Sequence, residues 1–174
     1  MVLLQDFANK QGDQYMLNCI YQLQKLKELE VDVTKSIKAL SKSEKYNLRS
    51  SLLQSIPGVS VLGSMILLTE LADINRFCNL DHLCSYVGLV PDTRSSGEVD
   101  RVGGLTYRAN KRLRVLLIEA SWIAIRHDNS LSLAYTNYCK KMRGQKAIVK
   151  IARKLLSRIR YVWLNQKSYK LNKA

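Results

Sequence analysis

Two adjacent serines, Ser95 and Ser96, lie in a polar stretch, residues 91–108, that is rich in glycine and arginine. Proline and glycine interrupt regular structure, so we expect these serines on an exposed connection. Arginines can hold a phosphodiester and favour the alkoxide form of a nearby hydroxyl, so Ser95 and Ser96 are candidate nucleophiles toward a nucleic-acid backbone. An ordinary solvated turn is the alternative. The cations expected to hold the phosphate are Arg94, Arg101, Arg108, Lys111 and Arg114.

The helix that follows the serines must position these cations. Asn110 is its expected N-cap, and an apolar stripe predicts that it runs to about His127. Its first turn carries Lys111, Arg112 and Arg114. Cations at a helix N-terminus oppose the helix dipole, and a bound anion would resolve that conflict.

Upstream, residues 52–77 contain two apolar helices joined by the segment Ile56-Pro57-Gly58-Val59. This layout is that of a helix-hairpin-helix element, whose turn points backbone N–H groups at a phosphate. Pro57 and Gly58 are the candidate turn residues. Ser60 stands where such a turn usually has a second glycine, so a purely structural helical hairpin is equally open. A short helix over residues 81–87 then leads to the serines.

The last helix is predicted from about Gln145 to Asn165, because apolar residues recur on one face and cations on the other. From Asn129 onward there are twelve basic residues and no acidic residue, whereas a solvated face usually mixes signs. We therefore expect the outer face to contact phosphate. The inner face comprises Ala147, Ile148, Ile151, Ala152, Leu155, Leu156, Ile159, Val162 and Trp163, and the phosphate contacts expected on the outer face are Lys146, Lys150, Arg153 and Arg158.

Residues 13–46 contain neither proline nor glycine, and apolar residues recur at heptad spacing. Seven of the eight positions at a and d are apolar, which predicts a coiled-coil seam and a homo-oligomer, either a dimer or a tetramer. One long amphipathic helix packed on its own domain is the alternative. The a positions are Met16, Leu23, Glu30 and Ile37, and the d positions are Cys19, Leu26, Val33 and Leu40.

The helical patterns along the sequence predict an all-α chain with an oligomerisation helix over residues 1–49 and a compact helical domain over residues 50–174. All of the net charge of +14 comes from the second half, where nineteen basic residues from Pro91 onward face five acidic ones. This asymmetry indicates a polyanionic partner.

Four scattered cysteines and two histidines do not have metal-site spacing, so we expect no metal in this chain and reduced thiols in a cytoplasmic protein. We expect neither a membrane span nor a signal peptide.

Four motifs in order resemble the C-terminal domain of insertion-sequence transposases of the IS one-ten / one-sixteen / nine-oh-two family. They are IPGVSVLGSMILLTELADINRF, LCSYVGLVPDTRSSG, ANKRLRVLLIEASW and GQKAIVKIARKLL, and together they cover about residues 50–165. The family's Ser-Gly pair falls on Ser96 and Gly97, so the resemblance favours Ser96 as nucleophile over Ser95. Tyr107 and Ala109 depart from the family's usual lysine and glycine.

The resemblance implies a DNA recombinase that is guided by a bridge RNA and cleaves and rejoins strands through a covalent serine link. In that family an N-terminal RuvC-like domain supplies four acidic ligands for Mg²⁺, followed by a coiled coil. This chain begins at the coiled coil, so we expect it to bind DNA, and guide RNA as a second partner, without cleaving strands alone. A non-catalytic helix-hairpin-helix module that binds nucleic acid and oligomerises is the alternative.

Overall fold

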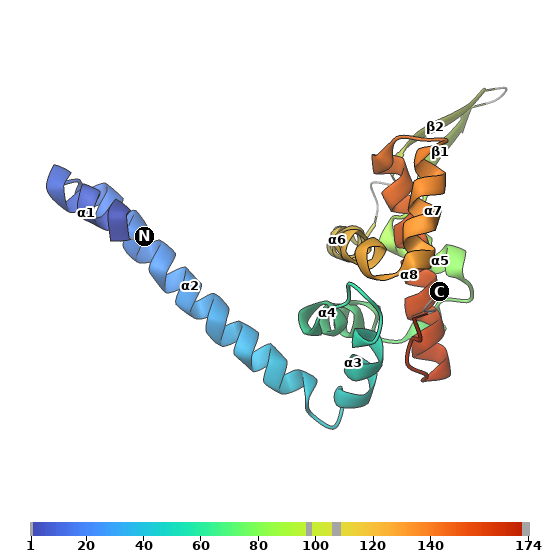
Figure 1. Ribbon diagram of the computed structural model, residues 1–174, viewed down its shortest axis with the longest axis horizontal. Helices are drawn as coiled ribbons and strands as arrows, with labels where there is room; N and C mark the ends of the chain where they lie inside the picture. The colour runs from blue at the N-terminus through green and yellow to red at the C-terminus, as the bar shows by residue number, and fades with distance from the viewer. Residues whose placement is uncertain (1, 97–98, 106–108, 172–174) are drawn as a thin grey trace. The chain divides into compact units, whose positions relative to one another are not determined.

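The computed structural model describes residues 2–96, 99–105 and 109–171, and packing divides the chain into two units at Lys42–Ser43. Both units are helical, which confirms the predicted all-α fold class, and one short β-hairpin is added to the second (Figure 1). The sequence placed the division at residue 49. The structure places it earlier because Ser43 already begins the turn into helix α3 (Asn47–Gln54), where its carbonyl accepts hydrogen bonds from the Tyr46 and Asn47 N–H groups.

The N-terminal unit pairs two helices, α1 (Val2–Gln11) and α2 (Gln14–Ser41). Gly12 between them has a positive φ of 65°, a conformation that suits glycine, and Asp13 caps α2 by accepting a hydrogen bond from the Met16 N–H at 3.0 Å. Ala8 of α1 and Ile20 of α2 are buried where the helices meet. The sequence patterns had not predicted α1 as a separate helix.

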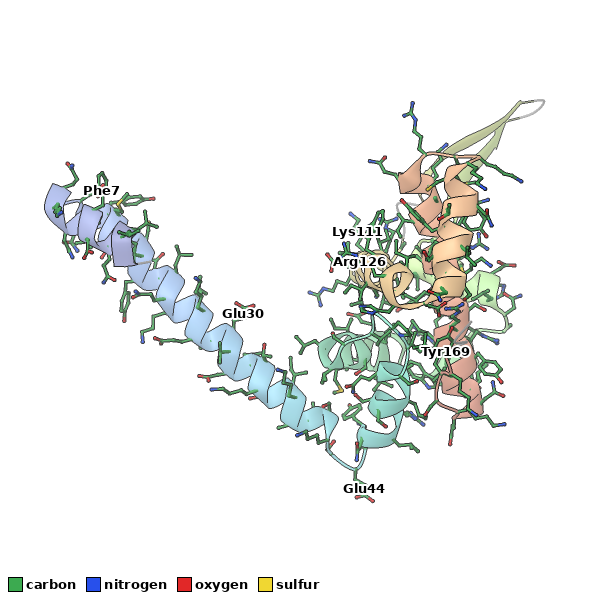
Figure 2. All side chains as sticks on the ribbon, in the orientation of Figure 1. Phe7, Glu30, Glu44, Lys111, Arg126 and Tyr169 are labelled. Carbon is green, nitrogen blue, oxygen red and sulfur yellow. The ribbon has the colours of Figure 1, made fainter. Side chains whose placement is uncertain are left out.

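The predicted heptad seam lies on α2, with Glu30 in the middle of the helix (Figure 2). Within the part of the chain that the structure describes, most of this seam is uncovered, since Leu23, Leu26 and Val33 are 50%, 63% and 57% exposed. The helix itself is confirmed, although it ends at Ser41 rather than near Tyr46. Association of the seam with another chain stays a prediction.

Helix α8 (Gly144–Asn165) forms the centre of the C-terminal body. It packs against α3, the short 3-10 helix η1 (Ile74–Arg76), α5 (Leu80–Val87), α6 (Lys111–His127) and α7 (Asn129–Cys139). The nine residues predicted for its inner face are its buried residues, so the helix is amphipathic as the sequence indicated. Burying this face leaves Lys146, Lys150 and Lys154 on the exposed side of α8.

The turn at Pro57 and Gly58 joins α3 to α4 (Val61–Leu71) and lies against α6. Gly58 has φ of 88°, and a Cβ atom there would come within 2.1 Å of the Ala120 carbonyl oxygen. Ser60 occupies the N-cap of α4 and accepts a hydrogen bond from the Gly63 N–H at 3.0 Å. This geometry gives Gly58 a packing role, which favours the structural account of the turn. Phosphate contact by Pro57 and Gly58 stays a prediction.

The serine segment is a two-stranded antiparallel hairpin, β1 (Pro91–Ser96) and β2 (Val99–Leu105), between α5 and α6. The serines were expected on a connection between helices, and that connection has regular strand pairing, since Ser95 pairs with Asp100 and Ser96 with Val99. Arg94 and Arg101 occupy partner positions in the same register.

We predict that Gly58→Ala destabilises the C-terminal body by at least about 2 kcal/mol, because the new methyl group meets the α6 backbone and the positive φ is strained. Gly63→Ala is the control, since its Cβ would make only ordinary contacts at 3.4 Å and alanine favours the helix. Urea unfolding followed by circular dichroism measures both. Equal stability of the two variants would contradict the packing role of Gly58.

Candidate active site and nucleic-acid interface

The two ends of the hairpin are joined where they meet the helical body. The chain leaves α5 through Gly88, which has a positive φ of 78°, and re-enters the body at Asn110. The Asn110 N–H donates to the Tyr86 carbonyl oxygen at 3.0 Å, and Arg114 Nη1 donates to the Gly88 carbonyl oxygen at 3.4 Å. These bonds fix the base of the segment that carries both serines.

Glu70 of α4 places a carboxylate beside the cationic start of α6. Its Oε2 atom accepts a hydrogen bond from Asn110 Nδ2 at 2.7 Å, and its Oε1 atom lies 3.8 Å from Arg112 Nη1. Asn110 in turn caps α6, as predicted, by accepting from the Leu113 N–H at 3.1 Å. A protein carboxylate therefore offsets part of the cation–dipole conflict that the sequence had assigned to a bound anion. Sequence analysis missed Glu70 because it precedes Asn110 by 40 residues.

The cations predicted around the serines divide into three groups. Arg94 and Arg101 lie on the two strands of the hairpin, while Lys111, labelled in Figure 2, and Arg114 lie in the first turn of α6. Arg108 lies outside the described residues. The base of the hairpin is joined to the first turn of α6 through Asn110 and Arg114, whereas Ser95 and Ser96 lie at the other end of β1.

The outer face of α8 carries the other predicted phosphate contacts. Lys146 and Lys150 are exposed, and Lys150 Nζ lies 5.2 Å from the centre of the Tyr138 ring. Arg153 Nη2 donates to Asp81 Oδ1 at 2.9 Å in a pair whose carboxylate side chain is 78% exposed. Such an exposed pair contributes little to stability, so Arg153 stays available to exchange the Asp81 carboxylate for a phosphate.

Arg158, also predicted as a phosphate contact, differs from the other cations of this face because it is paired with a buried carboxylate. Its Nη1 donates to Asp128 Oδ2 and its Nη2 to Ser130 Oγ, both at 2.6 Å. The guanidinium lies 5.1 Å from the Tyr169 ring centre, and the side chain is only 22% exposed. Arg158 therefore serves the fold, because its charge is matched by a buried carboxylate from the start of α7.

Asp128 is the carboxylate at the centre of this network. Burial alone would raise its pKa, but hydrogen bonds from Ser130, Tyr169 and the Leu131 N–H, together with the charge of Arg158, lower the pKa to about 2. Burial and the hydrogen bond to Asp128 raise the pKa of Tyr169 to about 12. The Tyr169 hydroxyl thus donates to Asp128 Oδ2, at 2.6 Å.

Tyr169 attaches the segment after α8 to the rest of the body. Gln166 ends the helix with a positive φ of 50°, and the N–H of Tyr169, labelled in Figure 2, donates to Ser55 Oγ at 2.8 Å. Sequence analysis missed Asp128 and Tyr169. One signal was present, since Asp128 is the last acidic residue before twelve basic ones and is thus the nearest carboxylate in sequence for them.

Among the described residues, no group of three His, Cys, Asp or Glu side chains lies together as a metal site. All four cysteines are free thiols, and burial raises the pKa of the Cys84 thiol. In the same part of the chain, no helix combines the length and apolar character needed to cross a membrane.

A family model described as the transposase IS116/IS110/IS902 family matches residues 50–137, about half of the chain. The chain belongs to this transposase family. The matched region begins within α3, ends within α7 and includes the serine hairpin, Glu70 and Asp128, whereas α8 lies beyond it.

Two relatives of this transposase-family chain cover similar lengths. The transposase for insertion sequence element IS1111A of Coxiella burnetii (strain RSA 493 / Nine Mile phase I) is 34% identical over 113 residues, which are 64% of this chain and 30% of the relative. The insertion element IS110 uncharacterized 43.6 kDa protein of Streptomyces coelicolor (strain ATCC BAA-471 / A3(2) / M145) is 29% identical over 111 residues, 62% of this chain and 27% of the relative. The chain thus spans about a third or less of their lengths.

We predict that acid weakens the C-terminal body through Asp128. Its pKa of about 2 in the folded chain lies below the value of about 3.9 expected when unfolded, so its contribution is present above about pH 4 and is lost as the pH falls toward 2. The loss should be about 2 kcal/mol, measured by urea unfolding across this pH range.

Asp128→Asn should remove that part of the pH dependence and cost about 3 kcal/mol near pH 7, because it leaves Arg158 without its charge partner. Asp81→Asn is the matched control, since it breaks an exposed pair with Arg153 and should cost less than about 1 kcal/mol. Similar costs for the two variants would show that the Asp128 network does not stabilise the body.

Proposed function

We propose that this chain is the part of a DNA transposase that binds nucleic acid and supplies the serine nucleophile for strand cleavage and rejoining. The observation that carries the proposal is the family match over residues 50–137, which includes Ser95 and Ser96. It is supported by a hairpin that is fixed at its base beside the basic first turn of α6.

The chemical step is phosphoryl transfer to Ser96. The Ser96 hydroxyl loses its proton, its oxygen forms a bond to a DNA phosphorus, and the bond from phosphorus to the neighbouring deoxyribose oxygen breaks as that oxygen takes up a proton. Rejoining reverses these changes with a different deoxyribose hydroxyl. Arg94 and Arg101, at partner positions on the hairpin, are proposed to stabilise the charge that develops on the phosphate.

The exposed lysines of α8 are proposed to hold the phosphate backbone. Lys146, Lys150 and Lys154 lie on its outer face, whereas the inner face is buried. Contacts of this kind position a nucleic acid without reading its bases, so DNA and a guide RNA could both use them. Arg158 is left out of this interface because it pairs with Asp128.

Mg²⁺ enters this proposal only through the family resemblance, which places its ligands on a RuvC-like domain. The described residues of this chain offer no cluster of ligands that fits the ion. No step of the proposed chemistry is therefore assigned to a metal held by this chain.

Ser96→Ala should abolish the covalent protein–DNA adduct, because the variant has no hydroxyl at the attacking position. The assay needs a RuvC-like domain, Mg²⁺ and a DNA substrate nicked so that the adduct accumulates. The melting temperature and DNA affinity should stay near those of the unmodified chain. An adduct that persists in Ser96→Ala and disappears in Ser95→Ala would assign the nucleophile to Ser95. Its persistence in the double variant would favour a non-catalytic binding module.

Replacing Lys146, Lys150 and Lys154 together by glutamine should weaken DNA binding and reduce its salt dependence. Each lost phosphate contact lowers the slope of log affinity against log salt by about one unit, so the expected change is about three. The control replaces Lys35, Lys38 and Lys42 of the N-terminal unit, which changes the net charge equally. Fluorescence anisotropy at several salt concentrations measures both, and identical slopes would remove α8 from the interface.

Residues of the α2 seam should hold two or more chains together, because its apolar side chains are exposed in the single chain. Glutamate at Leu26 and Val33 should lower the mass measured by light scattering at micromolar concentration. The control replaces Leu29 and Val31 by glutamate, since these residues are 59% and 50% exposed but lie outside the a and d positions. If the unmodified chain is already a monomer, the seam does not associate.

A further inference from the structure

Two shallow grooves meet along the outward face of α8. The first is lined by Leu80, Tyr138, Lys150, Arg153, Lys154 and Ser157. The second is lined by Ser157, Arg158, Tyr161, Lys167, Ser168, Tyr169 and Lys170. Because both include Ser157, they are two parts of one surface that continues from the end of α7 to the segment after α8.

The α8 residues of this surface form one stripe along the helix. Lys150, Lys154, Ser157 and Tyr161 follow one another at spacings of four, three and four residues, which keeps them on the same side. At a rise of about 1.5 Å per residue, the stripe from Lys150 to Tyr161 is about 16 Å long. It is long enough for several consecutive nucleotides rather than one isolated phosphate.

Tyrosines lie toward both ends of the stripe. Tyr161 is 59% exposed, and Tyr138 is half-buried beside Lys150. Proteins that hold unpaired strands combine aromatic rings, on which bases stack, with cations that follow the backbone. In a duplex the bases already stack on one another, so a face that only binds duplex phosphates has no use for exposed rings. The tyrosines therefore favour an unpaired strand.

The segment after α8 contributes the cations at the far end. Lys167 and Lys170 flank Tyr169, which is held by its bonds to Ser55 and Asp128. Tyr169 therefore acts as a positioning residue that keeps two lysines beside Tyr161. Without that attachment, the polar sequence of this segment gives it no reason to pack against the body.

The net charge of the surface is positive after its ion pairs are considered. Arg153 is paired with Asp81, and Arg158 with Asp128. Among the described residues, no carboxylate lies within ion-pair distance of Lys150, Lys154, Lys167 or Lys170. Four lysines therefore remain to attract a polyanion, and a like-charged partner would be repelled.

We infer that this surface, from Tyr138 through the α8 stripe to Lys170, holds an unpaired nucleic-acid strand by stacking bases on Tyr138 and Tyr161 while lysines contact its phosphates. The inference rests on the proposed nucleic-acid binding and goes beyond it by naming the form of the strand. Both DNA and RNA have the required bases and phosphates, so the experiment includes each.

The test uses the full chain and measures fluorescence anisotropy with labelled oligothymidine, oligouridine and a DNA duplex, each of about ten nucleotides per strand. The variant Tyr138→Leu with Tyr161→Leu keeps apolar side chains but removes the rings. It should bind the unpaired strands at least about tenfold more weakly and change duplex affinity by less than about twofold. The pair Tyr138→Phe with Tyr161→Phe should bind like the unmodified chain.

Tyr21→Leu is the matched control, because Tyr21 is 60% exposed on α2, in the other unit. Circular dichroism confirms that each variant is folded. A stronger effect on oligothymidine or on oligouridine identifies the strand as DNA or RNA, and either supports the inference. Equal losses for strands and duplex, or no loss, overturn it while leaving phosphate binding by α8 intact. If the unmodified chain binds none of the three probes, the proposed nucleic-acid interface fails as well.

Discussion

Burial of one face of α8 is the constraint on which the C-terminal body depends. Helix α8 buries nine residues and packs against α3, η1, α5, α6 and α7, and each fully buried aliphatic side chain contributes about 1.5–3 kcal/mol. Because the inner face must be apolar throughout, the cations of α8 can lie only on the outer face. The same requirement that stabilises the fold therefore places Lys146, Lys150 and Lys154 on one exposed surface.

Two polar clusters connect this core to the proposed activity. Glu70 joins α4 to the start of α6, next to the base of the serine hairpin, while Asp128 joins α7, Arg158 and Tyr169 beside the α8 surface. Each cluster uses a carboxylate from a distant part of the sequence to neutralise an arginine. The exposed lysines of α8 lie outside these two clusters and are proposed to meet a nucleic acid.

The spacing of apolar and polar residues in the sequence predicted the features that depend only on residues close together in the chain. It identified the whole buried face of α8 and the cap at Asn110, because helical spacing and capping are local properties. It could not predict that Arg158 pairs with Asp128, 30 residues earlier, or that Glu70 reaches Asn110. The hairpin was missed for another reason, since its strands are rich in polar residues and glycine and lack the apolar alternation that marks a half-buried strand.

The four hydrogen bonds accepted by the Asp128 carboxylate also bear on how the body opens and closes. The Asp128 carboxylate accepts hydrogen bonds from the first turn of α7, from Arg158 on α8 and from Tyr169 in the segment after α8. If one of these three parts detaches, the buried carboxylate loses a hydrogen-bond partner, which destabilises the other two parts as well. Segments linked in this way tend to exchange their amide hydrogens as a cooperative unit rather than by independent fraying. The segment after α8 would then be as protected from local unfolding as α8 itself.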